Sequence, residues 1–370
     1  MRTGFLFLIL LLSTCVLAQP VRPFTTNFTP KEYGYQYSAY THSVCTDSSG
    51  FLYAGTAYGI VQYNGYTWSF IPVKTGTYIY SLTYKDGRIY AGCHGDFGYL
   101  EPDLQGQLHY VSLLDKVQGN APAFSVIWKI VPCGQKLFFQ SEEAVFVYDG
   151  NKVQVARPAT SFHLAFGDGK EVYIREREKG LMKWENEKFT FVNGTQFLAD
   201  TGVFGVLPWE KNAHLIITQE AGFFLWSDSS YTQVLPTATK KLFSDAMLLG
   251  ALQLPGKHIA VYTIKSGIYI LDKDFTIVAR YSSATGMRSS EVHDLTTDAY
   301  GNLWAATQKG VCRLQYYSPY SFFGETAGIS GNVQSLALFN GKCFAGTTEG
   351  LYSAGTAEPT YTETGKVKGG

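Results

Sequence analysis

Short runs of apolar and aromatic residues, separated by tight turns, recur along the whole chain. The stretch from residue 47 to residue 65 shows the pattern first. Asp47 and Gly50 frame a turn, because an Asp side chain accepts hydrogen bonds from its own backbone and Gly adopts positive φ. Two apolar runs follow, and Asn64-Gly65 closes the stretch with a strong hairpin signal. The alternation predicts strand, turn, strand, turn and strand.

The same pattern returns at residues 298–311 and 340–352, which indicates a repeat protein. The glycine before the third strand of each unit, or its equivalent, marks the period. Successive markers are separated by 39, 46, 36, 42, 45, 43 and 40 residues. A period of about 42 residues with four short strands per unit is that of a β-propeller blade, whereas the common helical repeats have shorter periods. The markers are Gly59, Gly98, Ala144, Gly180, Gly222, Gly267, Gly310 and Gly350.

Eight units fit this period, and the start of the chain favours a ring of seven. Residues 24–28 have the character of a spare outer strand, and pairing them with residues 311–314 would close the ring and remove its exposed edges. We therefore expect an all-β chain. It has a seven-bladed β-propeller of four-stranded antiparallel blades at residues 19–318, and the first blade of a second propeller at 319–370. A single eight-bladed ring is the alternative. The units are expected to begin at Ser43, Ile79, Phe124, Phe162, Val203, Leu248, Val292 and Val333.

The N-terminus has the pattern of an export signal. Arg2 provides the positive end, residues 5–12 form an unbroken apolar run, and Ala18 ends a small-residue cleavage pattern. The run is shorter than the about 20 residues that a spanning helix needs. We expect a signal peptide at residues 1–18, with an uncleaved anchor or a lipoprotein attached through Cys15 as alternatives.

Composition narrows the class of protein. Basic and acidic residues number 30 each, so no basic surface for nucleic acid is expected. Aromatic residues make up 15% of the chain and 38 residues are Gly, which is typical of aromatic strands joined by Gly turns. No amphipathic helix longer than about two turns is expected. Five scattered cysteines follow the signal, and their odd number and spacing predict buried thiols rather than disulfides or a metal site: Cys45, Cys93, Cys133, Cys312 and Cys343.

The seventh unit carries the clearest motif of the chain. Residues 292–311 read V-H-D-L-T-T-D-A-Y-G-N-L-W-A-A-T-Q-K-G-V. This segment resembles the two-component regulator propeller repeat, whose form is V-x-x-I-x-x-D-x-x-G-x-L-W-x-x-T-x-x-G-L. The first and eighth units are also similar to that repeat, and units two to six are degenerate.

The resemblance implies a bacterial receptor. Such receptors carry two propellers outside the inner membrane, an immunoglobulin-like domain, one membrane span and a cytoplasmic histidine kinase or helix-turn-helix output. The resemblance therefore implies that this chain is the extracytoplasmic, periplasmic ligand-sensing part of a two-component-type receptor. It further implies that C-terminal membrane and output domains complete the receptor, which is compatible with a homodimer. An oligosaccharide or a similar small molecule is the implied ligand.

The turns between the second and third strands of each unit are candidate ligand contacts. In a propeller these turns share one face with the connections between units, and they ring the channel mouth. Sugar recognition uses an aromatic face and bidentate polar groups. Turns are also polar because they are solvated, so the alternative is that these residues have no role in binding. The candidates are Tyr58, His94, Asp96, Arg175, Arg177, Gln219 and Gln308.

No catalytic site, metal site or cofactor is expected. Residues 297–304 differ from the sialidase-type turn S-x-D-x-G-x-x-W by one extra residue between Asp and Gly. A lyase would need a His or Glu base facing the channel, and His94 is the best placed histidine. Glu142 and Glu143 are too sparse for a calcium-dependent hydrolase. A secreted lyase or glycosidase, or a protein-binding scaffold, are the alternatives to a sensor, because propellers host all of these functions.

Overall fold

The structure is a computed structural model in two compact units. Pro23–Tyr320 forms one unit, and Met1–Arg22 with Ser321–Gly370 forms the other. The expected signal peptide and the expected start of a second propeller at residue 319 lie outside the described residues. No helix in the described part of the chain is long and apolar enough to cross a membrane. The structure describes residues 24–34, 38–73, 78–120, 122–210, 213–227, 230–316, 318, 328–355 and 362–366.

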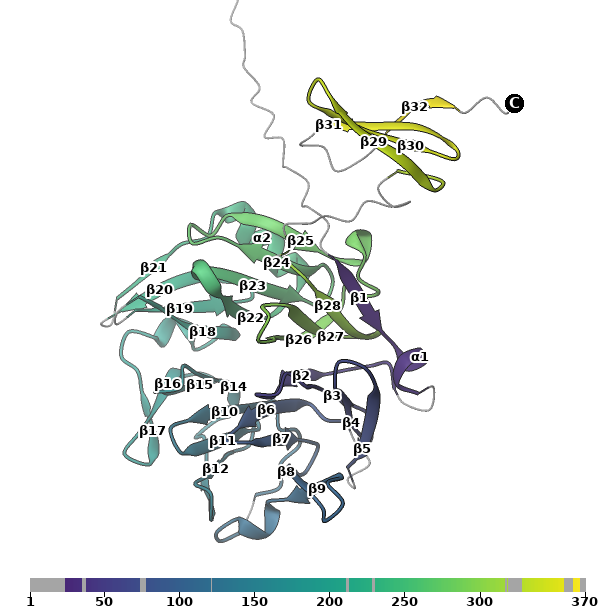
Figure 1. Ribbon diagram of the computed structural model, residues 1–370. Helices are drawn as coiled ribbons and strands as arrows, with labels where there is room; N and C mark the ends of the chain where they lie inside the picture. The colour runs from purple at the N-terminus through teal and green to yellow at the C-terminus, as the bar shows by residue number, and fades with distance from the viewer. Residues whose placement is uncertain are drawn as a thin grey trace, which may run out of the picture. The chain divides into compact units, whose positions relative to one another are not determined.

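Pro23–Tyr320 contains seven four-stranded antiparallel sheets within its described residues, as the predicted all-β fold class requires (Figure 1). Sheets one to six each use four consecutive strands. Sheets one to three contain β2 (Ser43–Thr46), β3 (Leu52–Thr56), β4 (Gly59–Tyr63), β5 (Trp68–Pro72); β6 (Ser81–Lys85), β7 (Arg88–Gly92), β8 (Phe97–Pro102), β9 (Leu108–Ser112); β10 (Lys129–Cys133), β11 (Lys136–Gln140), β12 (Val145–Tyr148) and β13 (Val153–Ala156). Sheets four to six contain β14 (Phe162–Gly167), β15 (Val172–Glu176), β16 (Gly180–Glu185), β17 (Lys188–Phe191); β18 (Val203–Glu210), β19 (Ala213–Thr218), β20 (Phe223–Ser227), β21 (Ser230–Gln233); β22 (Leu248–Leu254), β23 (His258–Thr263), β24 (Gly267–Leu271) and β25 (Ile277–Tyr281).

The seventh sheet joins the two ends of this unit. Its order is β1-β28-β27-β26, so a strand from the start of the chain lies beside the last strand of the repeat. β1 pairs antiparallel with β28, from Thr25 opposite Leu314 to Phe28 opposite Val311. The predicted pairing of residues 24–28 with residues 311–314 is therefore confirmed. The strands are β1 (Thr25–Phe28), β26 (Val292–Thr297), β27 (Leu303–Thr307) and β28 (Gly310–Leu314).

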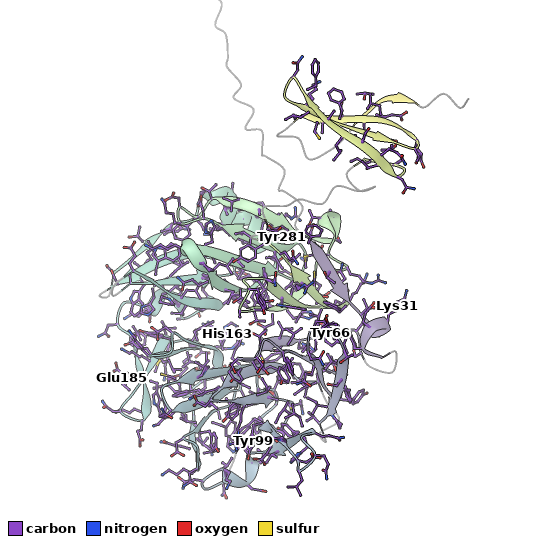
Figure 2. All side chains as sticks on the ribbon, in the orientation of Figure 1. Lys31, Tyr66, Tyr99, His163, Glu185 and Tyr281 are labelled. Atoms are coloured by element: carbon purple, nitrogen blue, oxygen red, sulfur yellow. The ribbon has the colours of Figure 1, made fainter. Side chains whose placement is uncertain are left out.

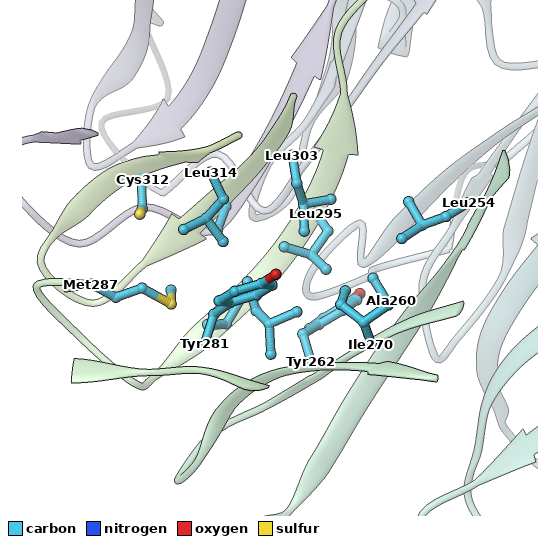
Figure 3. Close-up of a cluster of buried hydrophobic side chains, with 13 residues drawn as sticks. Leu254, Ala260, Tyr262, Ile270, Tyr281, Met287, Leu295, Leu303, Cys312 and Leu314 are labelled. Carbon is cyan, nitrogen blue, oxygen red and sulfur yellow. The ribbon is translucent and has the colours of Figure 1, made fainter. Parts of the chain in front are cut away.

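Neighbouring sheets pack face to face around a closed ring. The first strand of each sheet contacts that of the next, in the order β2, β6, β10, β14, β18, β22 and β26, and β26 contacts β2. Side chains fill the space between sheets (Figure 2), and in the described residues one cluster of buried apolar side chains lies at each of the seven interfaces. Figure 3 shows the cluster between sheets six and seven, which includes Tyr262, Tyr281, Leu295 and Leu314. Each sheet is stabilised by its neighbours, because that contact removes its apolar surface from water.

The Asp and Trp positions of the motif at residues 292–311 hold the first turn of sheet seven. In sheet seven, Asp298 Oδ1 accepts hydrogen bonds from the backbone N–H groups of Tyr300 and Asn302 at 3.0 and 2.9 Å. Its Oδ2 accepts the indole N–H of Trp304 at 2.9 Å. The Asp298 carboxylate therefore shapes the turn and orients the tryptophan that packs against the next sheet.

The repeated Thr and Gly positions hold the second turn. The Thr307 hydroxyl donates to the Gly310 carbonyl at 2.7 Å. Gly310 has φ of +107°, and a side chain there would collide with the carbonyl oxygen of Phe28 on the adjacent strand. The glycine marker thus reflects close strand approach as well as backbone conformation. The same bond joins Thr56 to Gly59, Ser141 to Ala144, Thr218 to Gly222, Thr263 to Gly267 and Thr347 to Gly350.

Two local predictions are wrong. α2 (Thr237–Ala246) has ten residues, so a helix longer than about two turns is present. Its buried side chains are those of Phe243 and Ala246. Two buried positions are too few to produce a recognisable pattern of apolar residues every 3.6 positions in the sequence. The third unit begins at Lys129 and not at Phe124, because the Phe124 ring anchors the preceding loop against core aromatic residues. The other described helices are α1 (Pro30–Tyr33), η1 (Leu114–Lys116), η2 (Gln196–Leu198), η3 (Pro255–Lys257) and η4 (Ser283–Thr285).

The eighth sheet belongs to the second unit and is described by itself. Its described core consists of Ile329, Ala345 and Tyr352. Leu336 and Leu338 of β29 are 68% and 71% exposed. The strands are β29 (Val333–Phe339), β30 (Lys342–Thr347), β31 (Gly350–Gly355) and β32 (Thr362–Lys366).

The five cysteines are free, as predicted. Cys45, Cys93 and Cys312 are buried, and Cys133 and Cys343 are partly buried. Burial raises the pKa of the Cys312 thiol to about 12, which keeps the thiol protonated and unreactive.

Candidate functional site

Two of the seven predicted ligand contacts connect parts of the scaffold. Arg175 is 4% exposed and donates hydrogen bonds to the carbonyl groups of Leu198, at 2.9 Å from Nε, and Ala199. Gln219 donates from Nε2 to the Leu248 carbonyl at 3.0 Å, which connects sheet five to sheet six. The polar groups of both side chains therefore form hydrogen bonds within the protein.

Asp96 is also engaged internally. It is 8% exposed, and its Oδ1 accepts hydrogen bonds from the Phe97 N–H at 2.7 Å and from the Ser112 hydroxyl at 2.6 Å. Burial raises the pKa of this carboxyl, and the Ser112 and Phe97 donors partly offset that rise. Asp96 thus holds the turn of sheet two against its outer strand.

The other four predicted contacts lie on the surface. Tyr58 is 64% exposed at the tip of its turn, and His94 and Gln308 are exposed in theirs. Arg177 lies 3.7 Å from Glu142 Oε1 in an exposed ion pair between sheets four and three. None of the seven predicted residues lines the channel cavity that the described residues form.

Six rings instead form a continuous arc at the channel mouth, just before or at the start of the first strands of sheets seven, one, two and three. We call this set the aromatic arc. The His293 and Tyr40 ring centroids are 4.6 Å apart, and those of His42 and Tyr80 are also 4.6 Å apart. The Tyr80 and Trp128 ring centroids are 5.3 Å apart, with the rings edge to face. The aromatic arc consists of Tyr40, His42, Tyr78, Tyr80, Trp128 and His293.

Four members of the aromatic arc have side chains that make no hydrogen bond within the described residues: His42, Tyr78, Tyr80 and Trp128. Tyr78 and Trp128 are 37% and 38% exposed. Burial, followed by the neighbouring His293, lowers the pKa of His42 to about 4, so its ring is neutral near pH 7 and carries one donor and one acceptor. The arc therefore offers apolar ring faces together with available polar atoms.

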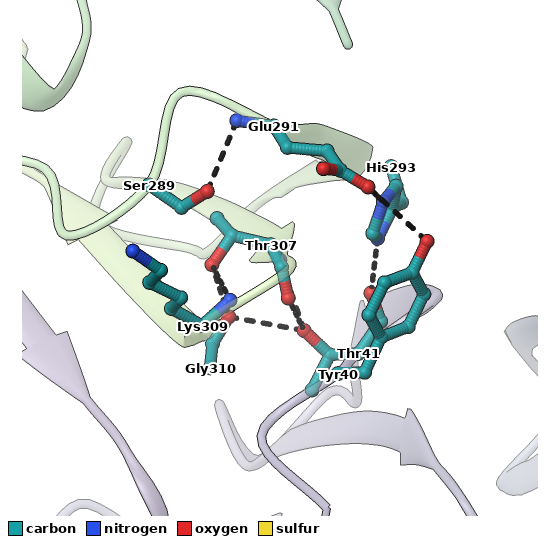
Figure 4. Close-up of polar contacts among 8 residues, drawn as sticks. All are labelled: Tyr40, Thr41, Ser289, Glu291, His293, Thr307, Lys309 and Gly310. Atoms are coloured by element: carbon teal, nitrogen blue, oxygen red, sulfur yellow. Dashed lines mark hydrogen bonds and ion pairs between the residues drawn. The ribbon is translucent and has the colours of Figure 1, made fainter.

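The first end of the aromatic arc is fixed by hydrogen bonds between sheets seven and one (Figure 4). His293 lies 2.6 Å from the Thr41 carbonyl oxygen through Nδ1 and 2.9 Å from Glu291 Oε1 through Nε2. Each ring nitrogen of His293 therefore faces an oxygen atom, one from the strand-start segment of sheet one and one from its own connection. Tyr40 donates its hydroxyl to the same Glu291 oxygen at 3.2 Å, and burial together with that carboxylate raises the pKa of Tyr40 to about 12.

A cavity of about 520 Å³ lies inside the ring and includes five members of the aromatic arc in its lining. Its walls come largely from β2, β6, β10, β14, β22 and β26. The volume falls within the roughly 300–1,000 Å³ that is usual for small-molecule sites. Its polar lining includes Ser43, Ser81, Thr83, Lys129, Tyr262, Asp294 and Thr296.

Lys129 and Asp294 face each other in this cavity. Lys129 Nζ lies 3.8 Å from Asp294 Oδ1, which is too long for a hydrogen bond, and the other carboxylate oxygen accepts from Ser43 Oγ at 2.8 Å and the Val44 N–H at 3.2 Å. Burial lowers the pKa of Lys129, but its neighbours Tyr262 and Asp294 outweigh this, so that the pKa is raised. Burial also raises the pKa of Tyr262, which keeps the phenol neutral and leaves Asp294 as the balancing anion.

One group of metal-ligating types lies elsewhere, between sheets four and five. Candidate ligand atoms of Asp168, Glu171 and His214 lie within 4.8 Å of one another. Lys183 Nζ is 2.6 Å from Glu171 Oε1, and Asp168 Oδ1 accepts the N–H groups of Lys170 and Glu171 at 2.9 and 2.7 Å. A lysine ammonium thus already neutralises the carboxylate, and the group is an ion pair network.

A sequence signal for the aromatic arc exists. Tyr40 and His42 precede sheet one, and Tyr78 and Tyr80 precede sheet two, with the same two-residue spacing. Alternate residues of an extended segment point to the same side, so each pair of rings faces one direction. The connections between units carry these rings, whereas six of the seven predicted contacts are in the turns within units and Arg175 is in β15.

No protein-family model and no curated protein matches the sequence. The chain is similar to the extracellular domain of a protein described as the hybrid two component system BT3049 of B. thetaiotaomicron. The TM-score is 0.65 with 16% identity, over 92% of this chain and 49% of that one. The fold is a β-propeller. For the extracellular domain of BT4673 from the same organism, the TM-score is 0.61 with 15% identity, over 93% of this chain and 47% of that one.

The propeller also resembles an enzyme. Virginiamycin B lyase from Staphylococcus aureus has a TM-score of 0.60 and 12% identity, over 80% of this chain and 99% of that one. The present chain spans about half the length of the two receptor domains. At these identities the comparisons establish the fold, and at that level they confirm the resemblance to extracellular domains of hybrid two component systems.

Proposed function

We propose that this chain is the ligand-sensing propeller region of a bacterial transmembrane receptor of two-component type, on the periplasmic side of the inner membrane. The fold shared with extracellular domains of hybrid two component systems supports this proposal, as does the repeat motif at residues 292–311. A membrane span and a histidine kinase or helix-turn-helix output would belong to the rest of the receptor. Ligand binding would shift the geometry of its domains, or of a homodimer, and so pass the signal.

The aromatic arc above its cavity is the observation that carries the proposal. An oligosaccharide presents apolar ring faces that pack on aromatic side chains and hydroxyl groups that bond to available polar atoms. His42, Tyr80 and Trp128 offer both kinds of contact. We therefore place an oligosaccharide, or a similar small ligand, on the aromatic arc, with the exposed turn residues Tyr58, His94, Arg177 and Gln308 as an outer rim.

Calorimetry with the purified chain and a panel of oligosaccharides tests this placement. Trp128→Ala removes a ring face, so affinity should fall by roughly 5- to 30-fold, the equivalent of about 1–2 kcal/mol. Tyr300→Ala is the matched control, because Tyr300 is 89% exposed and lies in a turn outside the cavity lining. The proposal is wrong if no saccharide binds, or if Trp128→Ala and Tyr80→Ala bind as well as the unmodified protein.

A secreted glycan lyase is the second candidate. Glu291 and His293 place a carboxylate and an imidazole 2.9 Å apart at the channel mouth, which are the group types that general acid–base catalysis uses. The shared fold of virginiamycin B lyase is compatible with this reading. Prolonged incubation with each bound saccharide, followed by chromatography, decides between the two. Unsaturated products that disappear in His293→Ala would replace sensing with catalysis, and intact saccharide would support sensing.

A further inference from the structure

We infer that Lys129 and Asp294 form a hydroxyl-binding couple that selects an uncharged sugar over its acidic counterpart. This inference rests on the proposed function and specifies the substrate class of the same site. The couple lies in the cavity lining together with the aromatic arc, so a saccharide that packs on the rings has a route to it.

The couple has N–H donors left over on Lys129 and one acceptor oxygen left over on Asp294. Lys129 contacts the Tyr262 hydroxyl, and because an ammonium has three N–H donors it keeps others for a ligand; about a third of its side chain is exposed. Asp294 uses Oδ2 to hold Ser43 and Val44, whereas no donor of the described residues lies within hydrogen-bond distance of its Oδ1, which faces Lys129 at 3.8 Å. The Asp294 carboxylate is therefore fixed in place by one oxygen and available through the other.

The 3.8 Å separation suits a third polar atom between the two groups. A hydroxyl oxygen at about 2.7–3.0 Å from both would accept from the ammonium and donate to the carboxylate, so that both groups gain the bond that they do not make with each other. Such charge-assisted hydrogen bonds are about twice as strong as those between neutral groups. A sugar hydroxyl is both donor and acceptor and meets this requirement; a carboxylate can only accept.

The charge of the cavity points to the same selectivity. The ammonium of Lys129 is balanced by Asp294, and the neighbouring His42 ring is neutral near pH 7. Glu291 and His293 pair with each other at the mouth. The phenols that line the cavity are neutral near pH 7. An acidic sugar would therefore bring an uncompensated negative charge next to Asp294, and desolvation of that charge is costly.

The position of Lys129 is shaped by a neighbouring strand. Tyr262 of β23 lies beside it, and a side chain at Gly250 on β22 would collide with the Tyr262 hydroxyl. Gly250 thus leaves the space in which the phenol stands. Lys129 and Asp294 are therefore held in place by the packing around them, unlike a pair of mobile charges on the surface.

Calorimetry with matched saccharides tests the inference. The probes are tetrasaccharides of glucose and galactose and the corresponding tetra-uronates, which replace a hydroxymethyl group by a carboxylate. The unmodified chain should bind at least one neutral probe at least tenfold more tightly than its uronate. Lys129→Met, which keeps the length of the side chain, should weaken the neutral probe at least tenfold. Asp294→Asn should shift the preference toward the uronate, because it leaves the ammonium unbalanced.

The outcomes separate this inference from the proposed function. A chain that prefers uronates, or a folded Lys129→Met variant that binds the neutral probe normally while Trp128→Ala does not, overturns the couple but leaves the sensing site intact. Absence of binding to every probe counts against both. Melting temperatures show whether each variant is folded, and Lys129→Met alone decides the question if Asp294→Asn does not fold.

Discussion

Truncation of Phe28 to alanine tests whether β1 closes the ring energetically. Phe28 is 8% exposed, and its ring centroid lies 5.1 Å from that of Tyr63, 5.3 Å from Trp68 and 5.8 Å from Trp304. Removal of a buried phenylalanine ring costs about 3–5 kcal/mol. β1 pairs with a single strand and can shift to fill part of the space, so we expect a loss of about 3 kcal/mol. At about 2 °C per kcal/mol for a large domain, the melting temperature should fall by about 6 °C.

Urea unfolding of the purified chain, followed by tryptophan fluorescence, measures this loss. Phe28→Leu keeps most of the apolar volume and should cost only about 1 kcal/mol. Tyr66→Ala is the surface control, because Tyr66 is 95% exposed, and it should change stability by less than about 0.5 kcal/mol. A loss below about 1 kcal/mol in Phe28→Ala would refute the view that β1 secures the ring.

Two further predictions concern the predicted contact residues and acid stability. Arg175→Ala should lower the unfolding free energy by roughly 2–4 kcal/mol, since it leaves buried carbonyls unpaired. Arg177→Ala removes only an exposed ion pair and should lower it by less than about 1 kcal/mol. Equal losses for the two variants in urea unfolding would contradict the scaffold role of Arg175. The second prediction concerns His163. Burial, followed by repulsion from Arg175 and Arg177, lowers the pKa of the His163 ring to about 4. The unfolded ring titrates at about 6.5 and takes up its proton first, so stability is complete above pH 6.5 and falls by on the order of 2 kcal/mol as the pH drops to 4. His163→Gln should make this pH dependence shallower, with the contribution of His42 remaining, and the exposed His94→Gln should not. An unchanged slope in His163→Gln would contradict the assignment.

The order of the sheets is predictable because each unit specifies its own turns. Val292, Val203 and Leu248 begin their sheets at the predicted residues, since glycine and aspartate turns limit where a strand can start. α2 escapes prediction because tertiary burial of Phe243 stabilises it more than any periodic pattern does. Local chemistry therefore determines most of the scaffold, and the exceptions are segments held by contacts distant in sequence.

The candidate site is much harder to predict. Tyr40 and His293 touch each other across more than 250 residues of chain, and no local pattern links them. Arg175 sits in a charged stretch that resembles a solvated turn, yet it lies within β15 and donates hydrogen bonds to the carbonyls of Leu198 and Ala199 at the end of η2. Which polar side chains face the channel depends on the stacking of sheets, and that stacking is a global property of the ring.

The pairing of β1 with β28 also affects when the ring can close during synthesis. Phe28 is synthesised early, but its partner Val311 follows 283 residues later. At about 5–20 residues per second, β1 waits roughly 15–60 s for a strand to pair with. During that interval an aromatic edge segment is without its cover, and six sheets can assemble around a gap. The architecture that protects the finished ring from edge-to-edge association therefore makes the nascent chain dependent on the seventh repeat. A translation pause before β28 would prolong the exposure of β1 to aggregation.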